Sequence, residues 1–179
     1  MRNAKTLFVV LCIMLTHLGT AHAKLGAFEF EHMVKGSTFI VIGKVKSVSL
    51  RKNATVEVLE ILKSAPGQEL VLNVGKTWTC DVSEAKKGET ILLFVSRNQK
   101  EKRNQIYASS RGRMPIDELK GKKYATFWPE VRMPKGIEVI KGPEPKWSFI
   151  RRANLGDLKK CIKKTLEESP NQAMDSDEK

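Results

Sequence analysis

The stretch "TILLFVS", Thr90 to Ser96, holds five consecutive apolar residues and follows a charged turn, "EAKKGE". A short continuous apolar run bounded by turn residues is typical of a strand that is buried on both faces. We therefore expect a central strand at Thr90–Ser96, with its partner strands in the flanking sequence.

Four further strands are predicted around this run. The segment "STFIVIGKVKSVSL" is rich in β-branched residues and predicts one long strand, Thr38–Leu50, in which Gly43 marks a bulge or a sharp bend. The segment "ATVEVLEILKS" alternates as far as Leu59, where a bulge explains the break; a helix is the competing interpretation. "ELVLNV" alternates again, and "QIYAS" predicts a short fifth strand. Five strands joined by turns indicate a small barrel or sandwich.

Helices are predicted at both ends of this β region. "FEFEHMVKG" predicts a short amino-terminal helix closed by Gly36, because glycine is common just past a helix end. Near the carboxyl end, Asn154 caps a helix through "LGDLKKCIKKTL", and Asp157 follows three residues later as in a capping box. The stripe expected to face the core consists of Leu155, Leu158, Ile162 and Leu166. We expect this carboxyl-terminal helix to pack on the barrel.

The pattern weakens between residues 110 and 153, where prolines and glycines are frequent. One strand is indicated there, at Ile137–Ile140. For the rest of this region we expect a long ordered excursion that packs on the barrel and is held by Trp128 and Trp147.

The first 23 residues have the features of a signal peptide. Arg2 and Lys5 precede the apolar run "LFVVLCIMLTHLG", and "AHA" then supplies the small residues of a cleavage site. The run is short for a bilayer span, which needs roughly 20 apolar residues, although an uncleaved amino-terminal anchor is the alternative. We expect cleavage after Ala23 and a secreted or periplasmic chain with no remaining transmembrane segment.

The mature chain is then long enough for one domain, residues 24–168, with a core of its own. Residues 169–179 are acidic and nearly devoid of apolar residues, so a disordered tail is expected. Cleavage would leave Cys80 and Cys161, and two cysteines in an exported protein most simply form one disulfide. A Cys–His pair with His32 is the alternative. The ligands of an ordinary zinc site are lacking, so we expect neither a metal nor a cofactor.

The chain carries a formal net charge of +12, which favours anionic partners. In "RGRMP", Arg111 and Arg113 flank a glycine, and two forked guanidinium donors suit a phosphate or a carboxylate. The candidate anion- or partner-binding surface comprises Arg111, Arg113, Lys86, Lys87, Lys122 and Lys123. The alternative is that the arginines pair with acids or remain solvated.

The segments "FIVIGKVKSV", "ATVEVLEILKS", a connector cysteine and "KGETILLFV" together resemble the exported bacterial proteins related to tissue inhibitors of metalloproteinases. The resemblance covers Thr38 to Val95. It implies a five-stranded netrin-like OB-type barrel with terminal helices packed over it. In the animal inhibitors an amino-terminal cysteine binds the zinc of the protease. The expected mature start here, Lys24-Leu25-Gly26, has no cysteine, so no inhibitory residue is carried over.

We expect a non-catalytic exported binding module that recognises a protein partner or an anionic envelope component. We do not expect a nucleic-acid partner, because the predicted strands offer few aromatic residues for stacking. An enzyme is not expected, because a hydrolytic triad needs a histidine beside a nucleophile and His32 stands alone in its helix. The alternatives are a metalloprotease inhibitor with an altered amino-terminal wedge and an enzyme that uses His32.

Overall fold

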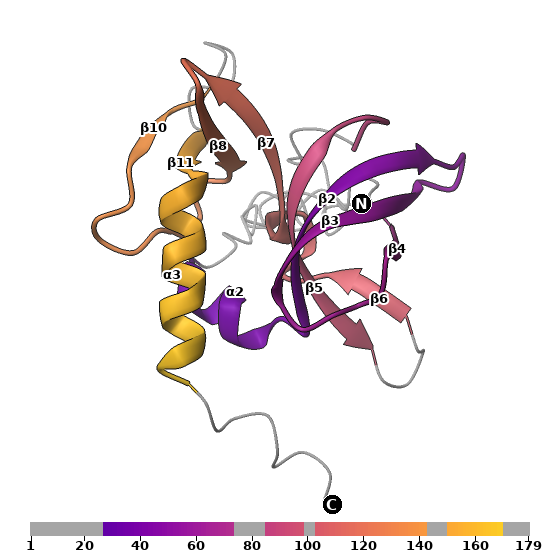
Figure 1. The fold of residues 1–179 in the computed structure, drawn as a ribbon, viewed down its shortest axis with the longest axis horizontal. Helices are drawn as coiled ribbons and strands as arrows, with labels where there is room; N and C mark the ends of the chain where they lie inside the picture. Colours follow the sequence, from indigo (N-terminus) through magenta and orange to yellow (C-terminus); the bar gives the residue numbers. More distant parts are fainter. Residues whose placement is uncertain (1–26, 74–84, 99–102, 143–149, 170–179) are drawn as a thin grey trace, which may run out of the picture.

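The computed structural model describes residues 27–73, 85–98, 103–142 and 150–169 (Figure 1). Within these ranges the chain is mainly β, as predicted: it forms eleven strands, two α-helices and one 3₁₀ helix. No helix in the described ranges is long and apolar enough to cross a membrane. The predicted signal peptide, Cys80, Trp147 and residues 170–179 lie outside the described residues.

The central strand is β5, Thr90–Asn98, and this prediction is confirmed. Every side chain from Ile91 to Val95 is fully buried. One edge of β5 pairs antiparallel with β2, Phe39–Val48. The other edge is shared: its first half pairs with β7, Arg113–Leu119, and its second half with β6, Arg103–Ile106. The apolar run therefore organises three partner strands.

Strand β2 also pairs with β3, Asn53–Lys63, which in turn pairs with β4, Glu69–Asn73. The ladder between β2 and β3 joins Ile42 to Glu60 and Gly43 to Val58, so Leu59 has no opposite residue. The predicted bulge near Leu59 is confirmed. The same bulge lies opposite Gly43, where glycine is required because a Cβ atom would overlap the Val56 side chain and lie 2.8 Å from the Glu57 carbonyl oxygen.

The predicted fifth strand, "QIYAS", is displaced towards the amino terminus. Strand β6 ends at Ile106, and the chain then turns through Ala108 and Ser109, both of which have positive φ angles. A 3₁₀ helix, η1 (Ser109–Gly112), leads directly into β7. The turn places β7 on the same edge of β5 as β6.

In the region from residue 110 to 153, the strand predicted at Ile137–Ile140 is present, slightly displaced, as β10, Val139–Lys141. The prediction of a long excursion for the rest of the region is wrong. Strands β7, β8 (Lys122–Phe127), β11 (Arg151–Asn154) and β10 (Val139–Lys141) form four adjacent strands, here called the wing. A short parallel pair joins β1, Phe28–Glu29, to β9, Val131–Arg132. The rest of the wing was missed because charged residues and Pro115 obscure the alternation along β7.

Two helices, α2 (Phe30–Gly36) and α3 (Leu155–Glu167), contact each other and pack against the strands (Figure 1). The predicted cap is confirmed: the Asp157 N–H donates to Asn154 Oδ1 at 3.2 Å. The predicted stripe is correct except at its end, where Thr165 is buried and Leu166 only partly so. Gly36 was predicted just past the helix end, but it is the last residue of the helix. A side chain at this position would overlap the Tyr107 ring and hydroxyl, so only glycine fits there.

The hydrophobic residues form two clusters on opposite sides of the sheet. The inner core lies among β2, β3, β4 and β5, with Ile106 of β6 packed against it. Strands β4 and β6 are in contact, although no ladder joins them in the described residues. The outer core lies between the sheet, the wing and the two helices, and includes Ile42, Leu92, Phe94 and Leu158.

The β2–β3 bulge generates a stability prediction. Replacing Gly43 by alanine should lower the free energy of unfolding by about 1–3 kcal/mol, because the added methyl group must displace Val56 or the backbone of β3. Urea unfolding followed by circular dichroism measures the change. The control is Lys44→Ala, an exposed position on the same strand, which should change stability by less than about 0.5 kcal/mol. Equal stability of the two variants would contradict the packing argument.

Candidate functional site

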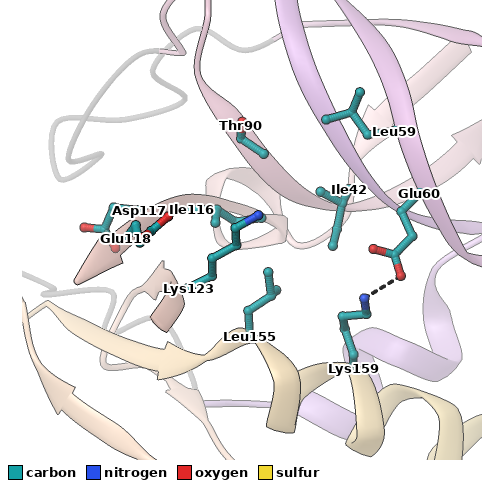
Figure 2. Close-up of a pocket in the computed structure, with 10 residues that line it drawn as sticks. All are labelled: Ile42, Leu59, Glu60, Thr90, Ile116, Asp117, Glu118, Lys123, Leu155 and Lys159. Carbon is teal, nitrogen blue, oxygen red and sulfur yellow. Dashed lines mark ion pairs between the residues drawn. The ribbon is translucent and has the colours of Figure 1, made fainter. Parts of the chain in front are cut away.

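An open cleft of about 450 Å³ lies where the wing meets β3 and the start of α3 (Figure 2). Its apolar lining comes from three parts of the chain: Ile42 and Leu59 from the β2–β3 ladder, Ile116 from β7, and Leu155 from α3. Leu59 is 53% exposed, because the bulge turns it away from both cores. An apolar surface with open access is the kind of site that accepts a side chain of another molecule.

Charged side chains form the rim of this cleft, and most of them already have partners. Lys159 Nζ lies 2.6 Å from Glu60 Oε1 and connects α3 to β3 (Figure 2). Asp117 forms an ion pair with Arg152 of β11. Glu118 and Lys123 lie opposite each other in the β7–β8 ladder. The rim is therefore polar without a strong excess of either charge, and the apolar lining dominates what the cleft can bind.

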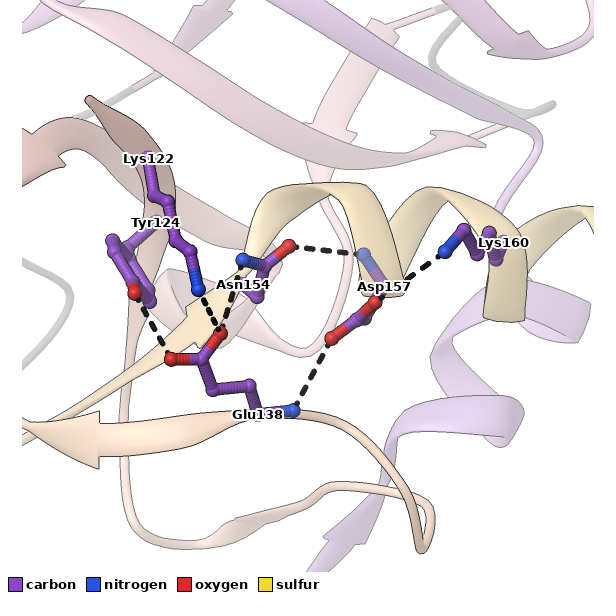
Figure 3. A network of polar contacts seen from close by, with 6 residues as sticks. All are labelled: Lys122, Tyr124, Glu138, Asn154, Asp157 and Lys160. Carbon is purple, nitrogen blue, oxygen red and sulfur yellow. Dashed lines mark hydrogen bonds and ion pairs between the residues drawn. The ribbon is translucent and has the colours of Figure 1, made fainter.

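A polar network fixes the wing to the start of α3 (Figure 3). Glu138 is its centre: Lys122 and Asn154 donate to Oε2 at 3.3 Å each, and the Tyr124 hydroxyl donates to Oε1 at 3.1 Å. The backbone N–H of Glu138 donates to the Asp157 carboxylate at 3.4 Å. The network therefore holds the wing, which forms one side of the cleft, in a fixed position relative to the start of α3.

The same network alters the ionisation of two of its members. Burial, followed by the hydrogen bond to Glu138, raises the pKa of the Tyr124 hydroxyl. The hydrogen bond and the negative charge of Glu138 raise the pKa of Lys122. Elevated pKa values favour protonated Tyr124 and Lys122, so the network stabilises the fold below about pH 10 and loses that effect as the pH rises through the elevated pKa values.

The two arginines of the predicted anion-binding surface are buried. Arg113 is 8% exposed, and its Nη1 donates to Glu89 Oε2 at 3.2 Å. Arg111 is 4% exposed, with its guanidinium 5.2 Å from the centre of the Phe28 ring. Arg113 therefore pairs with an acidic residue, as in the alternative interpretation given in the sequence analysis.

The four lysines of the same predicted surface are exposed and belong to two different segments of the chain. Lys86 and Lys87 precede β5, whereas Lys122 and Lys123 begin β8. Arg113 and Lys122 stand at opposite ends of the β7–β8 hairpin, about 20 Å apart at the usual rise of a strand. Because both arginines are buried, the exposed part of the predicted surface is its four lysines, and of these Lys123 lines the cleft.

Cys161 lies at the edge of the buried stripe of α3, as predicted, and burial raises the pKa of its thiol. It forms no disulfide within the described residues, and Cys80 lies outside them, so the Cys80–Cys161 bridge stays a prediction. His32 is exposed on α2. In the part of the chain that the structure describes, no group of three or more His, Cys, Asp or Glu residues could hold a metal ion.

The cleft was not predicted from the sequence. The β7–β8 hairpin was not predicted, and the sequence does not show where α3 packs relative to β3. The β7–β8 hairpin supplies Ile116 and Lys123. One signal was present: the bulge predicted at Leu59 breaks the alternation of an otherwise regular strand and exposes a large apolar side chain.

The sequence matches no protein-family model and no curated protein. The resemblance to the inhibitor-related proteins therefore remains an expectation from the quoted segments.

The Glu138 network generates a pKa prediction. Replacing Glu138 by glutamine removes a negative charge beside Tyr124, so the pKa of Tyr124 should fall towards its ordinary value, while burial keeps part of the elevation. An ultraviolet titration of the phenolate detects this change, because the chain has only two tyrosines. Glu118→Gln, on the same hairpin, is the control and should leave the titration unchanged. An unaltered Tyr124 pKa in Glu138→Gln would contradict the assigned role of Glu138.

Proposed function

We propose that this protein is an exported, non-catalytic interaction module whose cleft binds a partner protein. The observation that carries the proposal is the exposed Leu59, which stands over an open apolar cleft. In the free protein about half of this side chain remains exposed. Burial of the exposed half in a complex would contribute about 1 kcal/mol. Export is proposed from the amino-terminal sequence alone.

A protein partner suits this cleft better than an anionic polymer does. Of the two lysines that line the cleft, Lys159 is engaged by Glu60, and Lys123 lies opposite Glu118 in the β7–β8 ladder. Arg152, next to the rim, is engaged by Asp117. Phosphate or sulfate groups would have to compete with these ion pairs and would gain nothing from the apolar lining. The exposed lysines outside the cleft remain available for weak, salt-dependent attraction.

The arrangement of the strands supports the proposed OB-type, netrin-like barrel. In the order β4-β3-β2-β5-β6, the first long strand of the chain lies at the centre and pairs with the second and the fourth. A simple meander would pair each strand only with its neighbours in the sequence, whereas this order is of the Greek-key type found in OB barrels. Contact between β4 and β6, around the inner core, is consistent with a barrel.

The alternative function, inhibition of metalloproteases, depends on an amino-terminal wedge that begins at the predicted residue Lys24. That residue lies outside the described residues, and none of the described contacts favours this alternative. The cleft is therefore the basis of the proposal.

The proposal is tested by presenting the immobilised protein to the extracellular and envelope fractions of its source organism. Leu59→Asp should lower the retention of a wild-type-bound protein at least about tenfold, because the charge would be buried in the complex. The matched control is Leu50→Asp: Leu50 is fully exposed in the β2–β3 turn, away from the cleft.

Two outcomes would contradict the proposal. In the first, Leu59→Asp and Leu50→Asp retain the same proteins equally well. In the second, all retention disappears between about 50 mM and about 0.5 M salt regardless of the variant, which would indicate binding through exposed charges. Circular dichroism of both variants checks that the fold is kept, and substitution of an exposed residue should cost less than about 0.5 kcal/mol.

A further inference from the structure

A second cavity, of about 570 Å³, continues from the cleft between β3 and α3. The two cavities share Glu60 and Lys159, and the ion pair between these residues lies at their junction. This second cavity is called the groove here. Its apolar lining consists of Ile61, Leu62, Ile162 and Leu166, and its charged lining of three lysines and two glutamates: Lys159, Lys160, Lys163, Glu60 and Glu167.

The groove has an apolar part formed by both of its walls. Ile61 of β3 is 49% exposed, and Leu62 and Leu166 are only partly buried against the outer core. Ile162 is buried beneath them. The groove therefore offers a place for one large apolar side chain, as the cleft does on the other side of the Glu60–Lys159 pair.

The α3 side of the groove carries two lysines whose ammonium groups are available. The exposed fractions of the Lys160 and Lys163 side chains are 84% and 79%. Each reaches its intrahelical partner, Asp157 or Glu167, only at 3.8–3.9 Å. Exposed ion pairs of this kind contribute little and are readily exchanged for a better partner. Lys159 differs, because Glu60 holds it at 2.6 Å.

We propose that the groove binds a short acidic segment of the partner protein, with one large apolar side chain against Ile61 and Leu166 and carboxylates facing Lys160 and Lys163. This inference rests on the proposed function, since it assigns the chemistry of the partner segment that continues beyond the cleft. The two lysines are one turn apart on α3, about 4.5 Å along the helix axis, so two acidic residues close in sequence can reach both.

The test uses two fluorescein-labelled synthetic peptides, Asp-Glu-Leu-Glu-Asp and its uncharged counterpart Asn-Gln-Leu-Gln-Asn, and measures fluorescence anisotropy. The full chain should bind the acidic peptide at least about tenfold more tightly. The decisive variants are Lys163→Glu and Lys164→Glu. Both lysines are mostly exposed, and each lies 3.7–3.9 Å from a glutamate one turn later, but only Lys163 lines the groove. Lys163→Glu should weaken binding at least fivefold and Lys164→Glu less than twofold.

Three outcomes would overturn the inference. The first is no difference between the two peptides. The second is equal weakening by Lys163→Glu and Lys164→Glu, which would indicate attraction to the whole basic surface. The third concerns the acidic carboxyl terminus: if a chain ending at Ser169 binds the acidic peptide more than tenfold more tightly than the full chain, residues 170–179 are the natural occupant of the groove.

The peptide experiment and the Leu59 experiment can fail separately. Loss of partner retention in Leu59→Asp, together with no preference for the acidic peptide, would leave the cleft as the binding site and remove the groove. A specific effect of Lys163→Glu on the peptide with no effect of Leu59→Asp on any retained protein would support the acidic ligand and contradict the role of the cleft.

Discussion

The structure depends on one constraint, which is that both faces of β5 must be buried. Successive side chains of a strand point to opposite faces, so Leu92 and Phe94 enter the outer core while Ile91, Leu93 and Val95 enter the inner core. A slip of one residue in the register would exchange the two sets and fill each core with the wrong volumes. One face of β5 is covered by the other strands that surround the inner core. The opposite face is covered by the two helices and the wing, which form the outer core.

The geometry of the cleft follows from this arrangement. Because β6 and β7 divide one edge of β5 between them, β7 leaves the sheet in a direction that opens an angle between the wing and the β2–β3 ladder (Figure 1). Helix α3 closes the bottom of that angle, and Glu138 ties its first turn to the wing. The bulge then leaves Leu59 exposed over the opening. A position that a regular strand would bury or pair has become available to a partner.

Much of the fold could be predicted because its signals are local. Five apolar residues in a row identified β5, broken alternation identified the bulge at Leu59, and Asn154 with Asp157 identified the start of α3. Of the wing, only the strand near Ile140 could be predicted, because Pro115 and the charged residues of β7 hide a strand that is recognisable only beside β5. The site could not be predicted, because its residues come from segments far apart in the sequence. Arg113 is buried through its ion pair with Glu89, and the cleft forms only where β3, β7 and α3 meet.

The central claim is that β5 couples the inner and outer cores into one cooperative unit and thereby fixes the walls of the cleft. Native-state hydrogen exchange at increasing denaturant tests this claim most directly. The amides of Leu70 in β4, Leu93 in β5 and Leu158 in α3 should converge on one free energy of opening, within about 1 kcal/mol, because they exchange only through global unfolding. If the α3 amides instead opened in a separate, lower-energy step while β4 and β5 stayed protected, the two cores would be independent, and the account of a fixed cleft between them would be contradicted.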